Sequence, residues 1–196
     1  MDDIVEAALV KWPNVPHCTG WLLLDRRGQW RMRDERAQAC GELGAAVRHL
    51  ALIGFINRNY ECDEHGQWFF QNGPQRVYVE LAYTPWVVRL ALTGADGELT
   101  LTLADQTGGA FEPASVLIDD EGSVLLADTA TPARVALLHD HDLDLFSDLA
   151  TLASDGATGW FHWRAGCSLP IATVARAEVP ARFGFVASPA AACAGV

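Results

Sequence analysis

The string of alternating histidines and carboxylates at residues 139–144, His-Asp-His-Asp-Leu-Asp, contains the residue types of a metal site. On a strand, two histidines separated by one residue point the same way, and nearby carboxylates can complete a metal shell. Asp144, however, stands where the hydrolase pattern His-x-His-x-Asp-His needs a histidine. The same carboxylates also suit turn and cap positions before a helix. We therefore predict no bound metal or other cofactor, and keep His139 and His141 as candidates only for an enzyme.

A second candidate site is a group of five arginines within residues 26–36. On a strand, Arg31 and Arg33 share one face, while Trp30 and Met32 take the other. Guanidinium groups suit phosphates and carboxylates, so this pair could hold a small anionic ligand or an acidic partner. The alternative is a solvated face that neighbouring acidic side chains neutralise. In a further variant, this basic hairpin docks on the acidic second half of the same chain or of a second copy.

The densest aromatic and amide stretch spans residues 68–78, Trp-Phe-Phe-Gln-Asn-Gly-Pro-Gln-Arg-Val-Tyr. Strand alternation places Trp68 and Phe70 on one face and Phe69 on the other. Amide and guanidinium groups gather around the turn beside these apolar walls, which is the usual composition of a small-molecule pocket. The alternative is a buried central hairpin that satisfies its own turn hydrogen bonds. The predicted ligand-binding residues of the chain are Arg31, Arg33, Trp68, Phe70, Gln71, Asn72 and Arg76.

Motifs for nucleophilic catalysis and for phosphate binding are missing from the sequence. It contains no Gly-x-Ser-x-Gly elbow, no Gly-x-x-x-x-Gly-Lys loop and no Gly-x-Gly-x-x-Gly. His17 and Cys18 are sequence neighbours, but catalytic Cys–His pairs form between residues that the fold brings together. We therefore assign no catalytic residue. Five cysteines, an odd count without a Cys-x-x-Cys pair, indicate free thiols in a reducing cytoplasm.

The elements that must position these residues are hairpins. The signature Asp-x-x-Gly-Gln-Trp occurs at residues 25–30 and 63–68, and a looser copy occurs at residues 119–124. The Asp carboxylate can accept a backbone N–H two residues on, and the glycine supplies the positive φ that closes the turn. We therefore predict tight reversals at Gly28, Gly66 and Gly122. Independent hairpins are favoured over a duplicated unit, because the match between the first two copies soon fades.

The sequence as a whole predicts an α+β fold, mostly antiparallel sheet built of hairpins, with one long helix and one shorter helix. The long helix is expected at about 42–58, from an apolar stripe that includes Leu43 and Leu50, and the shorter one at about 143–153. A further short helix is expected over residues 2–11. Strands are predicted near residues 20–25, 29–33, 67–71, 76–83, 86–92, 98–104, 114–119, 123–127, 133–139, 159–164 and 171–177.

Charge is distributed unevenly along the 196 residues, with a net charge of −1 over residues 1–95 and −10 over residues 96–196. Such an acidic surface repels phosphate backbones, so we expect no nucleic-acid partner. No apolar run approaches the ~18 residues needed to span a membrane, and the acidic start lacks the positive region of a signal peptide. We expect a cytoplasmic protein with an aromatic-rich α+β half at residues 1–93, an acidic β-rich half at 94–186 and a frayed tail at 187–196.

Several of these motifs resemble a family of uncharacterised proteobacterial proteins, a conserved domain of unknown function. The likeness is carried by Trp-Pro-Asn-Val-Pro at residues 12–16, by Gly-Trp-Leu at 20–22, by residues 25–30 and by Gly66 to Val79. It covers residues 12–90 clearly and the rest loosely. The resemblance implies a bacterial origin and a cytosolic setting, and it brings no activity, cofactor or catalytic residue.

Two functions follow from these patterns. The first is a non-catalytic module that binds a small molecule or another protein, with a homodimer as one arrangement, because aromatic hairpin surface is abundant and no catalytic set is recognisable. The second is an enzyme acting on a small anionic or acyl substrate, in which an arginine holds the anion and His139 or His141 serves as acid–base or metal ligand. We favour the binding module.

Overall fold

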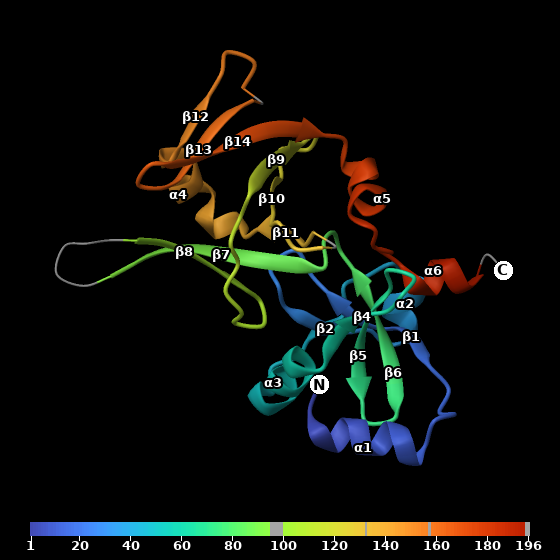
Figure 1. Ribbon diagram of the computed structural model, residues 1–196. Helices are drawn as coiled ribbons and strands as arrows, with labels where there is room; N and C mark the ends of the chain where they lie inside the picture. Colours follow the sequence, from blue (N-terminus) through green and yellow to red (C-terminus); the bar gives the residue numbers. More distant parts are fainter. Residues whose placement is uncertain (95–99, 132, 157, 195–196) are drawn as a thin grey trace. The chain divides into compact units, whose positions relative to one another are not determined.

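The structure is a computed structural model that describes residues 1–94, 100–131, 133–156 and 158–194. The fold is α+β with mostly antiparallel sheet, as the sequence predicts (Figure 1). The chain forms two compact units: unit 1 consists of Met1–Pro85 with Gly184–Val196, and unit 2 consists of Trp86–Phe183. Among the described residues, no helix has the length and apolar character needed to cross a membrane.

Unit 1 is built on a six-stranded sheet in the order β3-β2-β1-β6-β5-β4, in which only β1 and β6 are parallel neighbours. One face carries Leu24, Trp30 and Phe70, all buried, and Phe70 meets Phe55 of α3 edge to face with ring centroids 5.3 Å apart. The strands are β1 (Cys18–Leu24), β2 (Trp30–Met32), β3 (Ala45–Ala46), β4 (Tyr60–Cys62), β5 (Trp68–Asn72) and β6 (Gln75–Leu81), and the helices are α1 (Asp3–Lys11), α2 (Glu35–Ala39), α3 (Leu50–Arg58) and α6 (Pro189–Ala194).

Unit 2 is built on an eight-stranded sheet in the order β12-β13-β14-β9-β10-β11-β7-β8. Its two parallel pairs are β11 with β7 and β14 with β9. The strands are β7 (Trp86–Thr93), β8 (Thr100–Asp105), β9 (Ser115–Asp119), β10 (Val124–Ala127), β11 (Val135–Leu138), β12 (Ala150–Leu152), β13 (Gly159–Arg164) and β14 (Cys167–Val174), and the helices are η1 (Asp140–Asp142), α4 (Leu143–Asp148), η2 (Arg176–Glu178) and α5 (Val179–Phe183).

The sheet of unit 2 curls around a single apolar core. Strand β8 is the last strand at one end of the sheet, and β13 is the second strand from the other end. These two strands nevertheless approach each other. Leu101 and Leu103 of β8 therefore share one buried cluster with Phe161 and Trp163 of β13. Phe161 is fully buried and stacks on Phe146 of α4, with ring centroids 4.9 Å apart. The curl leaves a seam between the two ends of the sheet.

The three predicted reversals are confirmed. Gly28, Gly66 and Gly122 have φ of 73°, 77° and 80°. In each turn one carboxylate oxygen of the aspartate accepts two backbone N–H groups, from the second and the fourth residue after it. A fourth copy occurs at Asp105, with Gly108 at φ 90°. Each aspartate thus satisfies donors that the tight turn would otherwise leave unpaired.

The expected helix at 42–58 is shorter in the structure, because α3 begins only at Leu50. Upstream, Gly44 has φ of 80°, and a Cβ there would lie 2.3 Å from the carbonyl oxygen of Met32. This close approach lets β3 pair with β2, so the segment is held as a strand and not as a helix. His49 then caps α3, because its Nδ1 accepts the N–H of Leu52 at 3.2 Å.

The expected helix at 143–153 is also shorter. Helix α4 ends at Asp148, and residues 150–152 form β12, in which Ala150 pairs with Phe161 of β13. Pairing along the edge of the sheet therefore overrides the helical periodicity of this segment. With six short α-helices among the described residues, the expectation of one long and one shorter helix is wrong.

The bounds of the two units differ from the predicted halves, which met at residues 93 and 94. Within the predicted tail at 187–196, Leu81 N–H donates to the carbonyl of Ala187 at 2.8 Å, and α6 follows. Glu80 accepts hydrogen bonds from Ser188 Oγ at 2.5 Å and from Ala190 N at 3.0 Å, which tie this segment to β6. The start of the strand predicted at 98–104 and residues 195–196 of the predicted tail lie outside the described residues.

Candidate functional site

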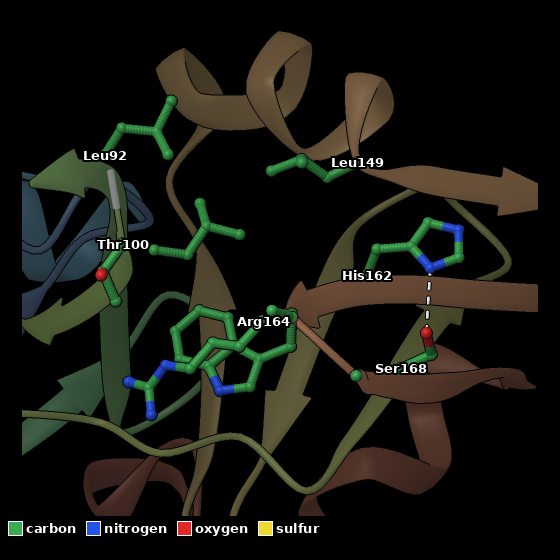
Figure 2. Close-up of a pocket in the computed structure, with 10 residues that line it drawn as sticks. Leu92, Thr100, Leu149, His162, Arg164 and Ser168 are labelled. Atoms are coloured by element: carbon green, nitrogen blue, oxygen red, sulfur yellow. Dashed lines mark hydrogen bonds between the residues drawn. The ribbon is translucent and has the colours of Figure 1, made fainter. Parts of the chain in front are cut away.

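A pocket of about 750 Å³ lies at the seam of the curled sheet of unit 2 (Figure 2). Its volume lies in the range of small-molecule sites, which combine apolar walls with a few polar groups, but most of its lining residues are exposed, so the pocket is open to solvent. The apolar lining comes from Leu92, Leu101, Leu149 and Trp163, and the polar side chains of the lining are Thr100, His162, Arg164 and Ser168. Because these residues belong to opposite ends of the sheet order, only the curl of the sheet brings them together.

The polar wall of this pocket is a chain of hydrogen bonds across three neighbouring strands. The Nδ1 atom of His162 lies 2.9 Å from the Oγ of Ser168, and its Nε2 atom lies 3.0 Å from the Oγ1 of Thr151. His162 and Ser168 face each other in the register of β13 and β14, and all three side chains are exposed. Figure 2 shows the first of these bonds on one side of the pocket, with Leu92 and Thr100 on the opposite side. The imidazole is therefore held in one orientation by two hydroxyl groups.

Arg164 supplies the positive charge of the pocket. Its guanidinium group lies over the ring of Trp163, 4.7 Å from the centroid, and donates to Glu112 Oε1 at 2.8 Å. The side chains of Arg164 and Glu112 are 39% and 65% exposed. An ion pair this exposed contributes little to stability, so an incoming anion can compete for the guanidinium group at low cost. The pocket thus offers a cation beside an aromatic wall.

The structure places the two predicted arginines of unit 1 in local roles. Arg31 Nε donates to the buried carboxylate of Asp25 at 2.7 Å, and Arg33 donates to the backbone carbonyls of Glu42 and Ala37. Both side chains therefore hold the β1–β2 hairpin and the segment after α2. If this basic hairpin docks on an acidic surface, fewer guanidinium N–H groups are available for that contact than the sequence suggests.

The other predicted residues lie on the β5–β6 hairpin. Phe70 and Gln71 are buried, and Gln71 Nε2 donates to the carbonyl of Gly73 at 2.9 Å. The ring of Trp68 lies tilted against that of Tyr60, and Arg76 lies over the ring of Phe69, while Asn72 is exposed at the end of β5. Strands β1 and β6 separate β2 from β5, a spacing of roughly 14 Å. The structure therefore does not bring the two arginines and the hairpin residues into one pocket.

The histidine and aspartate string at 139–144 forms the entry to α4. Asp142 accepts two hydrogen bonds from Arg89, at 2.7 and 2.9 Å, and one from the Leu90 N–H at 2.9 Å. Burial alone would raise the pKa of Asp142, but these hydrogen bonds hold it below its usual value. His139 is buried, and its Nδ1 accepts the His141 N–H at 3.1 Å. Within the described ranges, no group of three or more His, Cys, Asp or Glu side chains is placed to hold a metal ion.

The stability of the protein should depend on the protonation of His139. Burial, followed by the charge of Arg89, lowers the pKa of His139 below its usual value, although Asp140 opposes the shift. As the pH falls below about 6.5, the unfolded chain takes up a proton that the folded protein resists, so the free energy of unfolding decreases. This stabilisation is present above pH 6.5 and is lost as the pH falls through the folded-state pKa.

The measurement is chemical denaturation between pH 5 and 8 of the wild type and of His139→Asn. Asparagine keeps a side-chain acceptor for the His141 N–H but does not titrate. We expect a flatter pH dependence in the variant. Identical pH profiles for the two proteins would contradict the assignment.

Sequence reasoning missed the pocket of unit 2 and its polar wall. The strand predicted at 159–164 matches β13, and its alternation already places His162 and Arg164 on one face. The strand predicted at 171–177 starts too late, however, because β14 begins at Cys167. The strand bounds predicted from the sequence therefore do not include the pairing of His162 with Ser168. A turn at Gly166, where φ is 73°, was the available signal.

Comparisons with known proteins agree with this fold. The family described as "Protein of unknown function (DUF2946)" matches residues 1–190. The chain belongs to this family. No protein with curated annotation matches significantly. The resemblance to an uncharacterised family is thus confirmed in that broad form.

Two solved structures of the DUF1285 family are similar to the chain. The protein from Silicibacter pomeroyi DSS-3 is 17% identical, with a TM-score of 0.52, over 89% of this chain and 97% of its own. The protein from Shewanella baltica OS155 is 14% identical, with a TM-score of 0.43, over 66% of this chain and 91% of its own. At such identities the first similarity supports the fold alone, and function must be argued from the site.

Proposed function

We propose that the protein is a binding module whose unit 2 pocket takes a small carboxylate ligand with an apolar body. The observation that carries this proposal is the composition of the pocket, in which Arg164 and Ser168 stand beside Leu101, Leu149 and Trp163. Guanidinium and hydroxyl donors suit a carboxylate, and the apolar walls suit a short aliphatic or aromatic group.

The overall charge of unit 2 acts against an anionic ligand, but only at long range. The sequence of unit 2 contains 5 basic and 14 acidic residues. Exposed charges farther apart than about 8 Å are largely screened at physiological ionic strength. No acidic side chain of the described residues lines the pocket, but Glu112 is paired with Arg164 at 2.8 Å, so a bound carboxylate competes with Glu112 for the guanidinium group. The local contact therefore decides the preference.

The test is isothermal titration with benzoate and hexanoate, and with benzamide as an uncharged analogue. We expect benzoate to bind and benzamide to bind at least tenfold more weakly. Arg164→Ala should weaken benzoate binding by roughly 10- to 100-fold, because a hydrogen bond to a charged group contributes about 1.5–3 kcal/mol. The matched control is Arg176→Ala, which removes another paired arginine of unit 2 outside this pocket. Equal losses in both variants, or no binding of either acid, would contradict the proposal.

The remaining sequence predictions are kept as proposals of lower specificity. The four described cysteines, Cys18, Cys40, Cys62 and Cys167, are free, which supports a reducing compartment such as the cytoplasm. A homodimer and a proteobacterial origin stay predictions. The enzyme alternative through His139 and His141 gains no support, because His139 is buried and its Nδ1 accepts a backbone N–H.

A further inference from the structure

Ser168 has the local geometry of an activated hydroxyl. Its Oγ lies 2.9 Å from Nδ1 of His162, within the range for transfer of a proton. On the other side of the ring, Nε2 lies 3.0 Å from Thr151 Oγ1. When the Nε2–H donates to Thr151, Nδ1 is left as the acceptor of the Ser168 proton. The three side chains then form a base, its orienting group and a nucleophile, and the base and the nucleophile line the pocket.

We propose that Ser168 is a nucleophile toward acyl esters, with His162 as its general base and Thr151 as the residue that orients the imidazole. This inference uses the same pocket as the proposed function but does not require affinity for free carboxylates. It replaces His139 and His141 by His162 as the acid–base group of an acyl-transfer reaction. The acid that would be released belongs to the ligand class proposed above.

The reaction balances with an ester and water alone. Ser168 Oγ attacks the carbonyl carbon, and its proton passes to Nδ1 of His162 as the new C–O bond forms. The bond to the alcohol then breaks, and the alcohol leaves with that proton. Water cleaves the acyl-serine by the same route, which releases the carboxylic acid and restores neutral His162 and Ser168.

In the part of unit 2 that the structure describes, no charged donor is placed beside Ser168 for the charge that develops on the carbonyl oxygen. Arg164 lines the same pocket, but its guanidinium group donates to Glu112 and points away from the His162–Ser168 pair (Figure 2). Thr151 supplies a neutral hydroxyl where the well-known triads supply a carboxylate, so the imidazolium ion is stabilised less. We therefore expect slow turnover, and a reactive probe is the suitable test.

The probe is a fluorophosphonate, whose phosphorus is attacked by an activated serine as fluoride leaves. The full-length folded protein is labelled, and the adduct is located by intact mass and peptide mapping. We expect one adduct, on Ser168, that is absent in Ser168→Ala. His162→Gln should slow labelling about a hundredfold, the size of a general-base contribution. Thr151→Val should slow it less, as expected for a residue that acts through the imidazole.

The matched control is Ser154→Ala, which removes another exposed serine of unit 2 outside the pocket and should leave labelling unchanged. Failure of wild-type protein to label, while a known serine hydrolase labels in parallel, overturns the inference. So does labelling that persists in Ser168→Ala. Titration of benzoate into the wild-type protein separates the two proposals, because benzoate binding by a protein that does not label supports the binding proposal and refutes the nucleophile.

Discussion

Phe161→Ala is expected to lower the free energy of unfolding of unit 2 by about 3–5 kcal/mol, the typical cost of deleting a fully buried aromatic ring. Phe161 has 0% of its surface exposed and stacks on Phe146 at 4.9 Å. It also lies on the strand that brings the two ends of the sheet order together. The cavity left by its ring cannot be filled without moving β13, so the loss should be near the upper end.

The measurement is chemical denaturation, with amide hydrogen exchange by mass spectrometry to locate the loss. Peptides of residues 86–183 should lose protection in Phe161→Ala. Phe161→Leu is the matched control, because it keeps most of the apolar volume and should cost roughly half as much. Unchanged protection of unit 2 in the alanine variant would show that the curled core is not arranged around this ring.

Phe70→Ala is expected to have a similar effect in unit 1, about 3–5 kcal/mol, because this side chain is buried in the core. Phe70 is 5% exposed and packs edge to face against Phe55 of α3. The loss combines the burial of the ring with an aromatic contact worth roughly 1 kcal/mol. Denaturation curves of the purified variant give the value directly.

Arg76→Ala is the companion variant on the same hairpin. Its guanidinium group lies over Phe69 at a partly exposed site, so its removal should cost under about 1 kcal/mol. A variant Phe70→Ala that is as stable as Arg76→Ala would contradict the placement of Phe70 in the core of unit 1.

Local turn chemistry was the part of the fold that the sequence revealed well. The carboxylate of an aspartate and the positive φ of a glycine act within five residues, so Gly28, Gly66 and Gly122 could be identified without any tertiary information. The fourth turn, at Asp105 and Gly108, uses the same hydrogen bonds. Strand alternation was also readable, as in β13, whose predicted bounds match the structure.

Pairing between strands that are distant in the sequence determines the parts of the fold that the sequence did not predict. The apolar residues Leu43 and Leu50 suggested one long helix, but both side chains are exposed and the segment before Leu50 pairs with β2. Edge pairing likewise turned residues 150–152 into β12. Helical periodicity is a weak signal when a neighbouring strand offers backbone hydrogen bonds instead.

The side chains of the candidate pocket meet only because of such pairings between strands. Thr151, His162 and Ser168 meet because β12, β13 and β14 are neighbours in a specific register. A shift of one residue would place His162 on the opposite face of the sheet. The curl that adds Leu92 and Leu101 to the lining requires the whole order of eight strands, which no short motif encodes.

The most direct test of the binding proposal is an amide NMR titration of the ¹⁵N-labelled protein with benzoate. We expect saturable shifts in the amides of residues 162–168 and of Leu92, Leu101 and Leu149, which surround the unit 2 pocket. Residues 34–45, beside a separate pocket of unit 1, serve as the internal reference and should not move. Shifts confined to unit 1, or no saturable shift at millimolar benzoate, would contradict the central claim that the seam of the curled sheet holds a carboxylate.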